Sequence, residues 1–281
     1  MQFDNQNIMG INCPTSPTDT IFELRKKYGL ERKSMTKIPI QRNRSNSIPI
    51  FSWSELINND IPLYLMNGEI PLILGSSSSN RIAIAKHCHL NFSLEFPDID
   101  EASIRCDDPY ELPLLIARAK TDSLLARINR KKYKKGFLIT ADSVVLYKNE
   151  IREKPKNRTE AYEFLKSYSN DSVSTVTALV VTDIITGKTS TSIDIGTVSF
   201  NEINDAVINQ VIDRGRIFSS AGGFAIEDMD LYPLISETKG SYSSIMGLPV
   251  ESMVKCIDDV YTIQGSVTIT TEIDSDTSNE N

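Results

Sequence analysis

The chain has 281 residues, of which 40% are hydrophobic and 24% are charged, and its formal net charge is −7. This length and apolar content suffice for a large globular domain and exclude a wholly disordered chain. The negative charge argues against general nucleic-acid binding. No segment reaches the roughly 18 apolar residues of a membrane-spanning helix. The opening residues also lack the basic residues followed by apolar ones that are typical of a secretory signal. Four scattered cysteines favour a reducing compartment. We therefore expect a cytoplasmic protein without membrane partners.

Residues 1–68 differ in composition from the rest of the chain. They are rich in Asn, Ser, Pro and Thr, and the stretch 25–44 carries eight Lys or Arg residues. We expect a polar, basic and mostly disordered extension, then a folded domain over residues 69–262 and an acidic tail over residues 263–281. Binding of an anionic partner such as nucleic acid by the basic stretch is a less favoured alternative to a plain solvated tail.

Within the folded domain, patterns typical of strands and helices alternate. Strands are predicted at 70–74, 91–96, 136–140 continuing through 143–147, 173–184 and 189–200. Helices are predicted at 81–88, 108–130, 157–169, 204–214 and 249–260. Capping-box spacing marks two of the helix starts, at Asp108–Glu111 and Asn157–Glu160. The alternation predicts an α/β fold, in which helices flank a mixed, twisted sheet.

The segment 74–81, Leu-Gly-Ser-Ser-Ser-Ser-Asn-Arg, follows the first predicted strand and opens a helix. Small residues and serine hydroxyls at a helix N-terminus favour the approach of an anion. Arg81 in the first turn is suited to pair with a phosphate. A plain serine-rich capping turn, however, explains this segment better when it is taken alone.

Acidic residues lie at the ends of two of the predicted strands. Pro97-Asp-Ile-Asp-Glu101 comes after the second strand, and Asp142 lies at the carboxyl end of another. Ligands gather at the carboxyl ends of strands in open α/β sheets, so these carboxylates can share one cleft and hold a hard divalent cation such as Mg²⁺. Lys120 and Lys154 supply cations in the same part of the domain. Taken singly, each acid is more often a turn residue, and a lysine flanking an apolar helix face is usually exposed.

Together these segments resemble the Maf family of nucleoside triphosphate pyrophosphatases over about residues 72–260, most closely its plant-like eukaryotic branch. The likeness rests on seven motifs in the family's order, which are Ser76-Ser-Ser-Ser-Asn-Arg81, Asp100-Glu101, Ala117-Arg-Ala-Lys-Thr121, Thr140-Ala-Asp-Ser-Val-Val145, Lys154-Pro155, Ala221-Gly-Gly-Phe224 and Gly247-Leu-Pro249. The resemblance implies a fold like that of inosine triphosphatase, with a cleft between two lobes. Relatives are commonly homodimers, so we expect a homodimer here.

The resemblance also implies an activity, the hydrolysis of a nucleoside triphosphate to the monophosphate and pyrophosphate. It implies that Glu101 and Asp142 hold Mg²⁺ or Mn²⁺, that Asp142 accepts a proton from the attacking water, and that Lys154 steadies the leaving group. The substrate-binding residues that it implies are Ser76, Ser78, Asn80, Arg81, Lys120, Ser143 and Glu227. An alternative is a catalytically weak, nucleotide-binding regulator of cell division.

Asn80, Ser143 and Glu227 occupy the three positions that vary with base choice in the family. Branches that prefer dTTP and UTP carry Arg, Thr and Gln there, and the branch that prefers 7-methyl-GTP carries Trp, Gln and Glu. This chain matches neither set. Ile82, moreover, stands where many relatives have a polar or basic residue. The nucleobase therefore stays open between a pyrimidine and a modified nucleotide.

Overall fold

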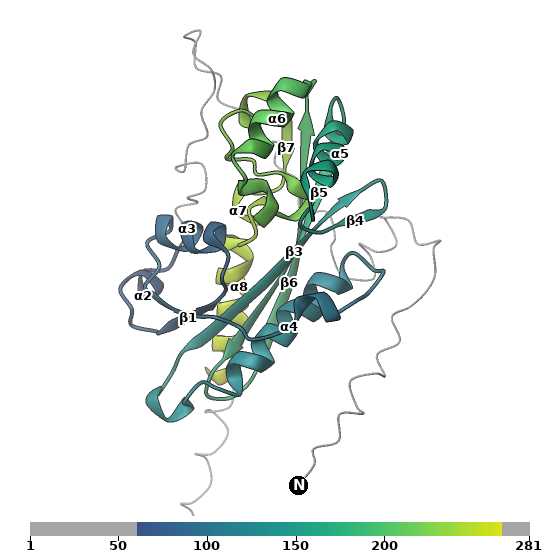
Figure 1. The fold of residues 1–281 in the computed structure, drawn as a ribbon. Coiled ribbons are helices and arrows are strands. Elements are labelled where there is room, and N and C mark those ends of the chain that lie inside the picture. The colour runs from purple at the N-terminus through teal and green to yellow at the C-terminus, as the bar shows by residue number, and fades with distance from the viewer. Residues whose placement is uncertain (1–60, 266–281) are drawn as a thin grey trace, which may run out of the picture.

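The structure is a computed structural model that describes residues 61–265 (Figure 1). The acidic tail from residue 266 and the basic extension up to residue 60 lie outside these residues, so their predicted character stays a prediction. The core includes the fully buried Leu65 in the short helix α2 (Leu63–Met66), upstream of the domain boundary predicted at 69. Within 61–265, no helix is both long and apolar enough to cross a bilayer.

Seven strands form one mixed sheet, in the order β2-β1-β3-β5-β6-β7, with β4 paired to β3 beside this path. The strands are β1 Leu72–Gly75, β2 Phe92–Glu95, β3 Phe137–Tyr147, β4 Glu150–Arg152, β5 Ser172–Asp183, β6 Thr189–Phe200 and β7 Ile235–Lys239. The remaining helices are α3 Ser79–His87, α4 Glu111–Leu125, α5 Arg158–Tyr168, α6 Asp205–Asp213, α7 Tyr242–Ile245 and α8 Val250–Gly265. β1 runs parallel to β2 and β3, and every other pairing is antiparallel. The predicted α/β fold with a mixed sheet is confirmed.

The core lies on both faces of the sheet, because side chains alternate along the central strand β5. Ala178 and Val180 pack against α4, while Leu179 and Val181 join the large cluster that includes Met253 of α8. The helices α4 and α8 accordingly lie on opposite faces of the long strands (Figure 1). This two-sided burial explains why β5 is almost continuously apolar or small, as a strand covered on both faces must be.

One edge of β3 has a short stretch that is not paired with another strand. β1 pairs with residues 137–140 of β3, and β4 pairs with residues 145–147 on the same edge. β5 occupies the opposite edge of β3 over nearly its whole length. Residues 141–144 therefore face no strand on the first edge in the described part of the chain. Asp142 and Ser143 lie in this gap, so Asp142 is in the middle of β3 and not, as predicted, at the carboxyl end of a strand.

The local signals in the sequence mark several elements correctly. Asn157 Oδ1 accepts the backbone N–H of Glu160 at 3.0 Å, so the predicted start of α5 is confirmed. Asp108 Oδ1 accepts the backbone N–H of Tyr110 at 2.9 Å, but α4 begins only at Glu111, later than predicted. The first of these helices, α4, ends earlier than predicted, at Leu125. The short strands β4 and β7 were not predicted. Cys88 and Cys256 are buried free thiols.

The turn at Gly222 yields a stability prediction, since its φ is +64° and an added Cβ would lie 2.7 Å from side-chain carbons of Val145. Backbone strain and overpacking each cost about 1–3 kcal/mol. Gly222→Ala should therefore lower the free energy of unfolding by about 2–5 kcal/mol in a denaturant titration. Gly215→Ala is the matched control, because φ is +75° there but no atom lies within 4 Å of the added Cβ. Equal losses in the two variants would show that the contact with Val145 is unimportant.

Candidate active site

A cleft of about 670 Å³ opens at the gap in the edge of β3. Its walls come from the β1–α3 loop, the segment after β2, α4, the β4–α5 loop, the segment 219–227 and the turn 245–247. All ten site residues predicted from the sequence line this one cleft, namely Ser76, Ser78, Asn80, Arg81, Glu101, Lys120, Asp142, Ser143, Lys154 and Glu227. The fold thus brings together side chains that lie far apart along the chain.

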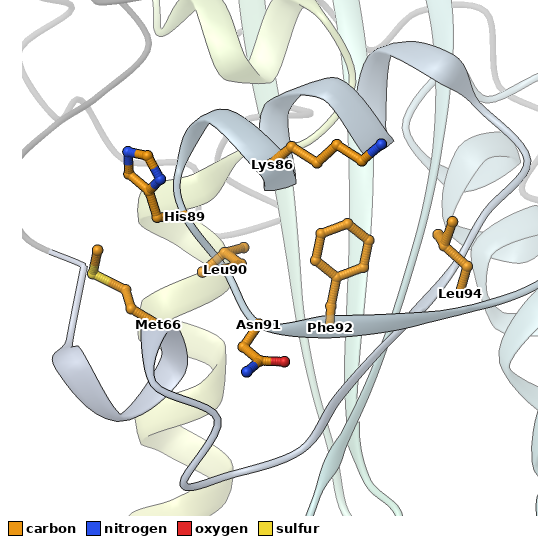
Figure 2. A pocket seen from close by; sticks show the side chains of 7 residues that line it. All are labelled: Met66, Lys86, His89, Leu90, Asn91, Phe92 and Leu94. Carbon is orange, nitrogen blue, oxygen red and sulfur yellow. The ribbon is translucent and has the colours of Figure 1, made fainter.

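A second hollow lies beside α2 and β2 (Figure 2). Its lining residues are Met66, Lys86, His89, Leu90, Asn91, Phe92 and Leu94. Figure 2 shows Lys86 and His89 as its charged or titratable groups, with no carboxylate among the labelled side chains. A hollow without a carboxylate has little means of binding a hard cation or moving a proton from water, so the cleft at β3 is the candidate active site.

At the centre of the cleft, two carboxylates share the ammonium group of Lys120. Its Nζ donates to Asp142 Oδ1 at 2.8 Å and forms an ion pair with Glu101 Oε1 at 2.9 Å. The Lys120 side chain is only 5% exposed, against the usual expectation for a lysine beside an apolar face. Burial of an unpaired ammonium is very costly, so the two carboxylates are what make this position tolerable.

The helix α4 is tied to β3 next to Lys120. The hydroxyls of Thr121 and Thr140 lie 2.7 Å apart, and their oxygens lie 3.1 and 2.9 Å from the backbone carbonyl of Ala117, so their two hydrogens serve two of these three contacts. All three groups are buried, so the contacts are shielded from water. The register of α4 on β3, and with it the meeting of Lys120 and Asp142, follows from this buried polar contact.

Glu101 reaches the cleft from a 3-10 turn, Glu101–Ser103, that follows β2. Asp100 caps this turn by accepting the N–H of Ala102 at 3.1 Å. Burial alone would raise the pKa of Glu101, but the charge of Lys120 and its hydrogen bond, helped by Lys154 and Arg81, outweigh burial and lower it. Glu101 is therefore held as an anion beside Asp142.

Arg81 is committed to protein partners. Its Nε donates to the carbonyl of Gly247 at 2.7 Å, and Nη2 donates to Ser143 Oγ at 3.0 Å. Thr177 Oγ1 lies 2.9 Å from Ser143 Oγ and donates to the carbonyl of Ser244 at 3.0 Å. Because the only Thr177 hydroxyl hydrogen goes to that carbonyl, Ser143 is the donor in its contact with Thr177. Ser143 can therefore offer the cleft an acceptor lone pair but no hydrogen.

The serine loop before α3 acts as a helix cap. Ser78 Oγ accepts the N–H of Arg81 at 3.5 Å, and Ser76 Oγ accepts the N–H of Ser78 at 3.1 Å. The capping interpretation of this segment is therefore confirmed. Anion binding by the same residues stays a prediction, which the position of Ser76 and Ser78 in the cleft wall permits.

Glu227 is the buried acceptor of the cleft, with a side chain that is 5% exposed. Its Oε1 is 3.3 Å from Arg216, and the Asn80 side chain also hydrogen-bonds the carboxylate. The other oxygen, Oε2, is buried without a hydrogen-bond partner within the described residues. Burial raises the pKa of Glu227, opposed by its own backbone N–H, Arg216 and Asn80. A buried carboxylate oxygen without a donor is costly, which points to a ligand that supplies N–H groups.

The cleft fits a divalent cation together with a polyphosphate. Residues 61–265 contain no cluster of three or more His, Cys, Asp or Glu side chains suited to a metal. Magnesium, however, is usually held by one or two carboxylates, with substrate phosphates and water as its other ligands, and Glu101 with Asp142 matches that pattern. The formal charges lining the cleft cancel, since six cations (Arg81, Arg105, Lys120, Arg152, Lys154, Lys156) face six acids (Glu101, Asp142, Glu150, Glu153, Glu160, Glu227). A polyphosphate bound there needs extra positive charge.

Sequence reasoning missed the supporting residues Thr177, Arg152 and Arg216. Thr177 gave no signal in a strand rich in Thr and Val. The Arg152 guanidinium lies 4.4 and 4.5 Å from the ring centres of Tyr147 and Phe164, which joins β4 to α5. Only the tertiary structure reveals these contacts, because each one joins separate segments whose packing no local pattern predicts.

Known proteins with similar sequences share the region that forms the cleft. A family model described as Maf-like protein matches residues 71–260. A 7-methyl-GTP pyrophosphatase of Dictyostelium discoideum is 40% identical over 182 residues, which cover 64% of this chain and 91% of the relative. A dTTP/UTP pyrophosphatase of Treponema denticola is 29% identical over 194 residues, covering 66% of this chain and 95% of the relative. A 7-methyl-GTP pyrophosphatase of Pseudoalteromonas translucida is 31% identical over 180 residues, covering 64% and 87%.

The lowered pKa of Glu101 gives a pH prediction. A carboxylate whose folded-state pKa is depressed stabilises the fold above its unfolded pKa, and this stabilisation is lost as pH falls through the folded value. The free energy of unfolding should therefore fall between about pH 5 and pH 3, and Glu101→Gln should remove part of that fall. Because Glu101 is partly exposed, we expect its share to be only about 0.5 kcal/mol. Urea titrations across this range measure it, and identical slopes for both proteins would contradict the role of Lys120.

Proposed function

The chain belongs to the Maf family, and from this premise we propose that it hydrolyses a nucleoside triphosphate to the nucleoside monophosphate and pyrophosphate with the aid of a divalent cation. The observation that carries the proposal is the pair of carboxylates on Lys120, in a cleft that also contains Lys154 and the N-terminus of α3. Two carboxylates that can hold a cation, beside groups that can meet a phosphate, are what metal-assisted phosphate hydrolysis requires.

In this proposal, Glu101 and Asp142 hold Mg²⁺ or Mn²⁺. When bound, the cation neutralises charge on the phosphate oxygens and makes the phosphorus easier to attack. Asp142 orients the attacking water through a carboxylate oxygen and accepts its proton as the bond to phosphorus forms. Lys120 keeps Glu101 ionised and holds both carboxylates at a fixed separation, and the exposed Lys154 approaches the leaving pyrophosphate.

The N-terminal turn of α3 has two separate tasks in this proposal. The hydroxyl hydrogens of Ser76 and Ser78, with the helix dipole, approach the phosphates. Arg81 adds positive charge to the cleft while holding Gly247 and Ser143 in place, which makes it a positioning residue. Direct pairing of Arg81 with phosphate would break two hydrogen bonds that are largely buried, so we favour the indirect role.

We further propose a guanine-type base, as in 7-methyl-GTP, as the preferred substrate. An ionised carboxylate only accepts hydrogen bonds, and the Watson–Crick edge of guanine offers two adjacent N–H donors. Uracil and thymine offer one N–H donor between two carbonyl acceptors, and a buried carboxylate would repel these carbonyls. The buried, unpartnered Oε2 of Glu227 therefore supports the guanine edge, with Asn80 beside it. The relative at 40% identity, named as a 7-methyl-GTP pyrophosphatase, supports the same choice.

A non-catalytic regulator is the less favoured function. Loss of catalysis would be expected to remove the acidic pair or Lys154, and all three are retained in the cleft. A homodimer, a cytoplasmic location and the absence of nucleic-acid binding stay predictions. The basic stretch 25–44, on which nucleic-acid binding would depend, lies outside the described residues.

Asp142→Asn tests the chemistry of the site. The amide cannot accept the proton of water, so turnover should fall by at least about 10²-fold in an assay of pyrophosphate release. Chelation of divalent cations should abolish turnover of the unmodified protein, and added Mg²⁺ or Mn²⁺ should restore it. Asp205→Asn is the control, since Asp205 pairs with Lys166 outside the cleft. Full turnover by Asp142→Asn, or turnover unaffected by chelation, would reject the proposed mechanism.

Glu227→Gln tests the choice of base. The neutral amide can donate to a pyrimidine carbonyl, so the ratio of kcat/KM for 7-methyl-GTP to that for UTP should fall by at least about tenfold. The loss should appear mainly in KM, because Glu227 is assigned to the base and not to the reacting phosphorus. A ratio that does not change would show that Glu227 makes no contact with the base.

A further inference from the structure

Half of the cations that line the cleft are committed to the protein. The ammonium of Lys120 is shared by two carboxylates, Arg81 bonds a carbonyl and a hydroxyl, and Arg152 lies among aromatic rings and bonds Glu150. All three side chains are buried. Turning any of them toward a substrate would break contacts that are shielded from water and hard to replace. The positive groups that can meet a phosphate chain at little cost must therefore be others.

Arg105, in contrast to these three buried cations, is exposed to solvent. Its side chain is 57% exposed, and its Nη1 lies 3.5 Å from Glu153 Oε1, whose side chain is 51% exposed. Nη1 also donates to the carbonyl of Ile104 at 3.0 Å. Exposed ion pairs of this length contribute little stability and are readily exchanged. Arg105 can therefore leave Glu153 at small cost.

The pair joins two walls of the cleft that come from different parts of the fold. Arg105 lies four residues after Glu101, beyond the turn that carries the carboxylate, and Glu153 precedes Lys154 in the β4–α5 loop. Both side chains line the cleft. The guanidinium is thus next to the segments that supply Glu101 and Lys154. Within residues 61–265, no hydrogen bond or ion pair joins it to Asn80 or Glu227, the residues assigned to the base.

We propose that Arg105 is a substrate-binding residue, which exchanges Glu153 for the pyrophosphate half of the bound nucleotide. This inference rests on the proposed function. A guanidinium presents paired N–H donors that match two oxygens of a phosphate as well as those of a carboxylate. Glu153 occupies Arg105 in the free protein and competes with the phosphate. The exposed rim where Arg105 lies is also where a leaving pyrophosphate has access to solvent.

If Arg105 exchanges Glu153 for phosphate, substitutions of these two residues should have opposite effects on nucleotide and pyrophosphate binding. A purely structural ion pair would not give opposite effects. Arg105→Gln should raise KM for the nucleotide, and the inhibition constant of pyrophosphate, about tenfold. Glu153→Gln removes the competitor and should lower both by about twofold. Inhibition by the nucleoside monophosphate should change in neither variant. The backbone carbonyl of Glu153, which accepts the N–H of Gly222 at 2.9 Å, is kept in Glu153→Gln.

Arg158 and Asp213 form the matched control pair. They are an exposed ion pair of similar accessibility, 53% and 66%, and neither lines the cleft. Arg158→Gln and Asp213→Asn should leave KM and pyrophosphate inhibition unchanged. The inference fails if Arg105→Gln behaves like Arg158→Gln, if Glu153→Gln weakens binding, or if monophosphate inhibition is lost in place of pyrophosphate inhibition.

Calorimetric titration with Mg²⁺-pyrophosphate separates this inference from the proposed function. Tenfold weaker pyrophosphate binding by Arg105→Gln, with normal binding by Arg158→Gln, supports the site whether or not a nucleotide is hydrolysed. If the unmodified protein releases no pyrophosphate from any nucleotide, the proposed function fails while this result stands. If it hydrolyses nucleotides but both arginine variants bind pyrophosphate equally well, the proposed function stands and the assignment of Arg105 is rejected.

Discussion

The site depends on one buried ammonium group. Lys120 can lie inside the domain only because Asp142 and Glu101 both accept hydrogen bonds from it or pair with it at 2.8–2.9 Å. The same contacts hold two carboxylates close together, which their mutual repulsion would otherwise oppose. Removing either carboxylate leaves a poorly compensated charge on Lys120, so the architecture of the cleft depends on all three groups together.

The gap in the sheet is what allows this cluster to meet a ligand. Between the segments paired with β1 and β4, one edge of β3 is uncovered, and neighbouring residues point to opposite faces. Asp142 meets Lys120 of α4 on one face, while Ser143 meets Arg81 on the other. The loop at Gly222 closes over the same region, because its N–H bonds the carbonyl of Glu153 and its backbone packs on Val145. A continuous sheet would have buried these groups beyond the reach of a substrate.

The cations that line the cleft divide into buried ones with structural roles and exposed ones that can bind a ligand. Buried cations are already bonded to protein groups, and the lining of the cleft has no net formal charge. A phosphate chain therefore depends on a divalent cation and on side chains at the rim, where exchange of partners costs little. Where the nucleobase is proposed to bind, Glu227 Oε2 is an acceptor that the described protein groups leave without a donor. A bound base can supply that donor.

The sequence by itself determined the elements whose signals are local. Asn157 marks the start of α5, the Thr, Val and Ile residues of β5 and β6 predict long paired strands, and ordered motifs point to ten residues that line the cleft. The short strands β4 and β7 gave no such signal, since three to five residues carry too little periodic pattern. Only the tertiary structure decided that Lys120 is buried, that Arg81 is bound to protein and that Arg105 stays exchangeable. Those properties depend on which distant groups the register of α4, β3 and the β4–α5 loop brings within hydrogen-bonding distance, and no local pattern encodes that.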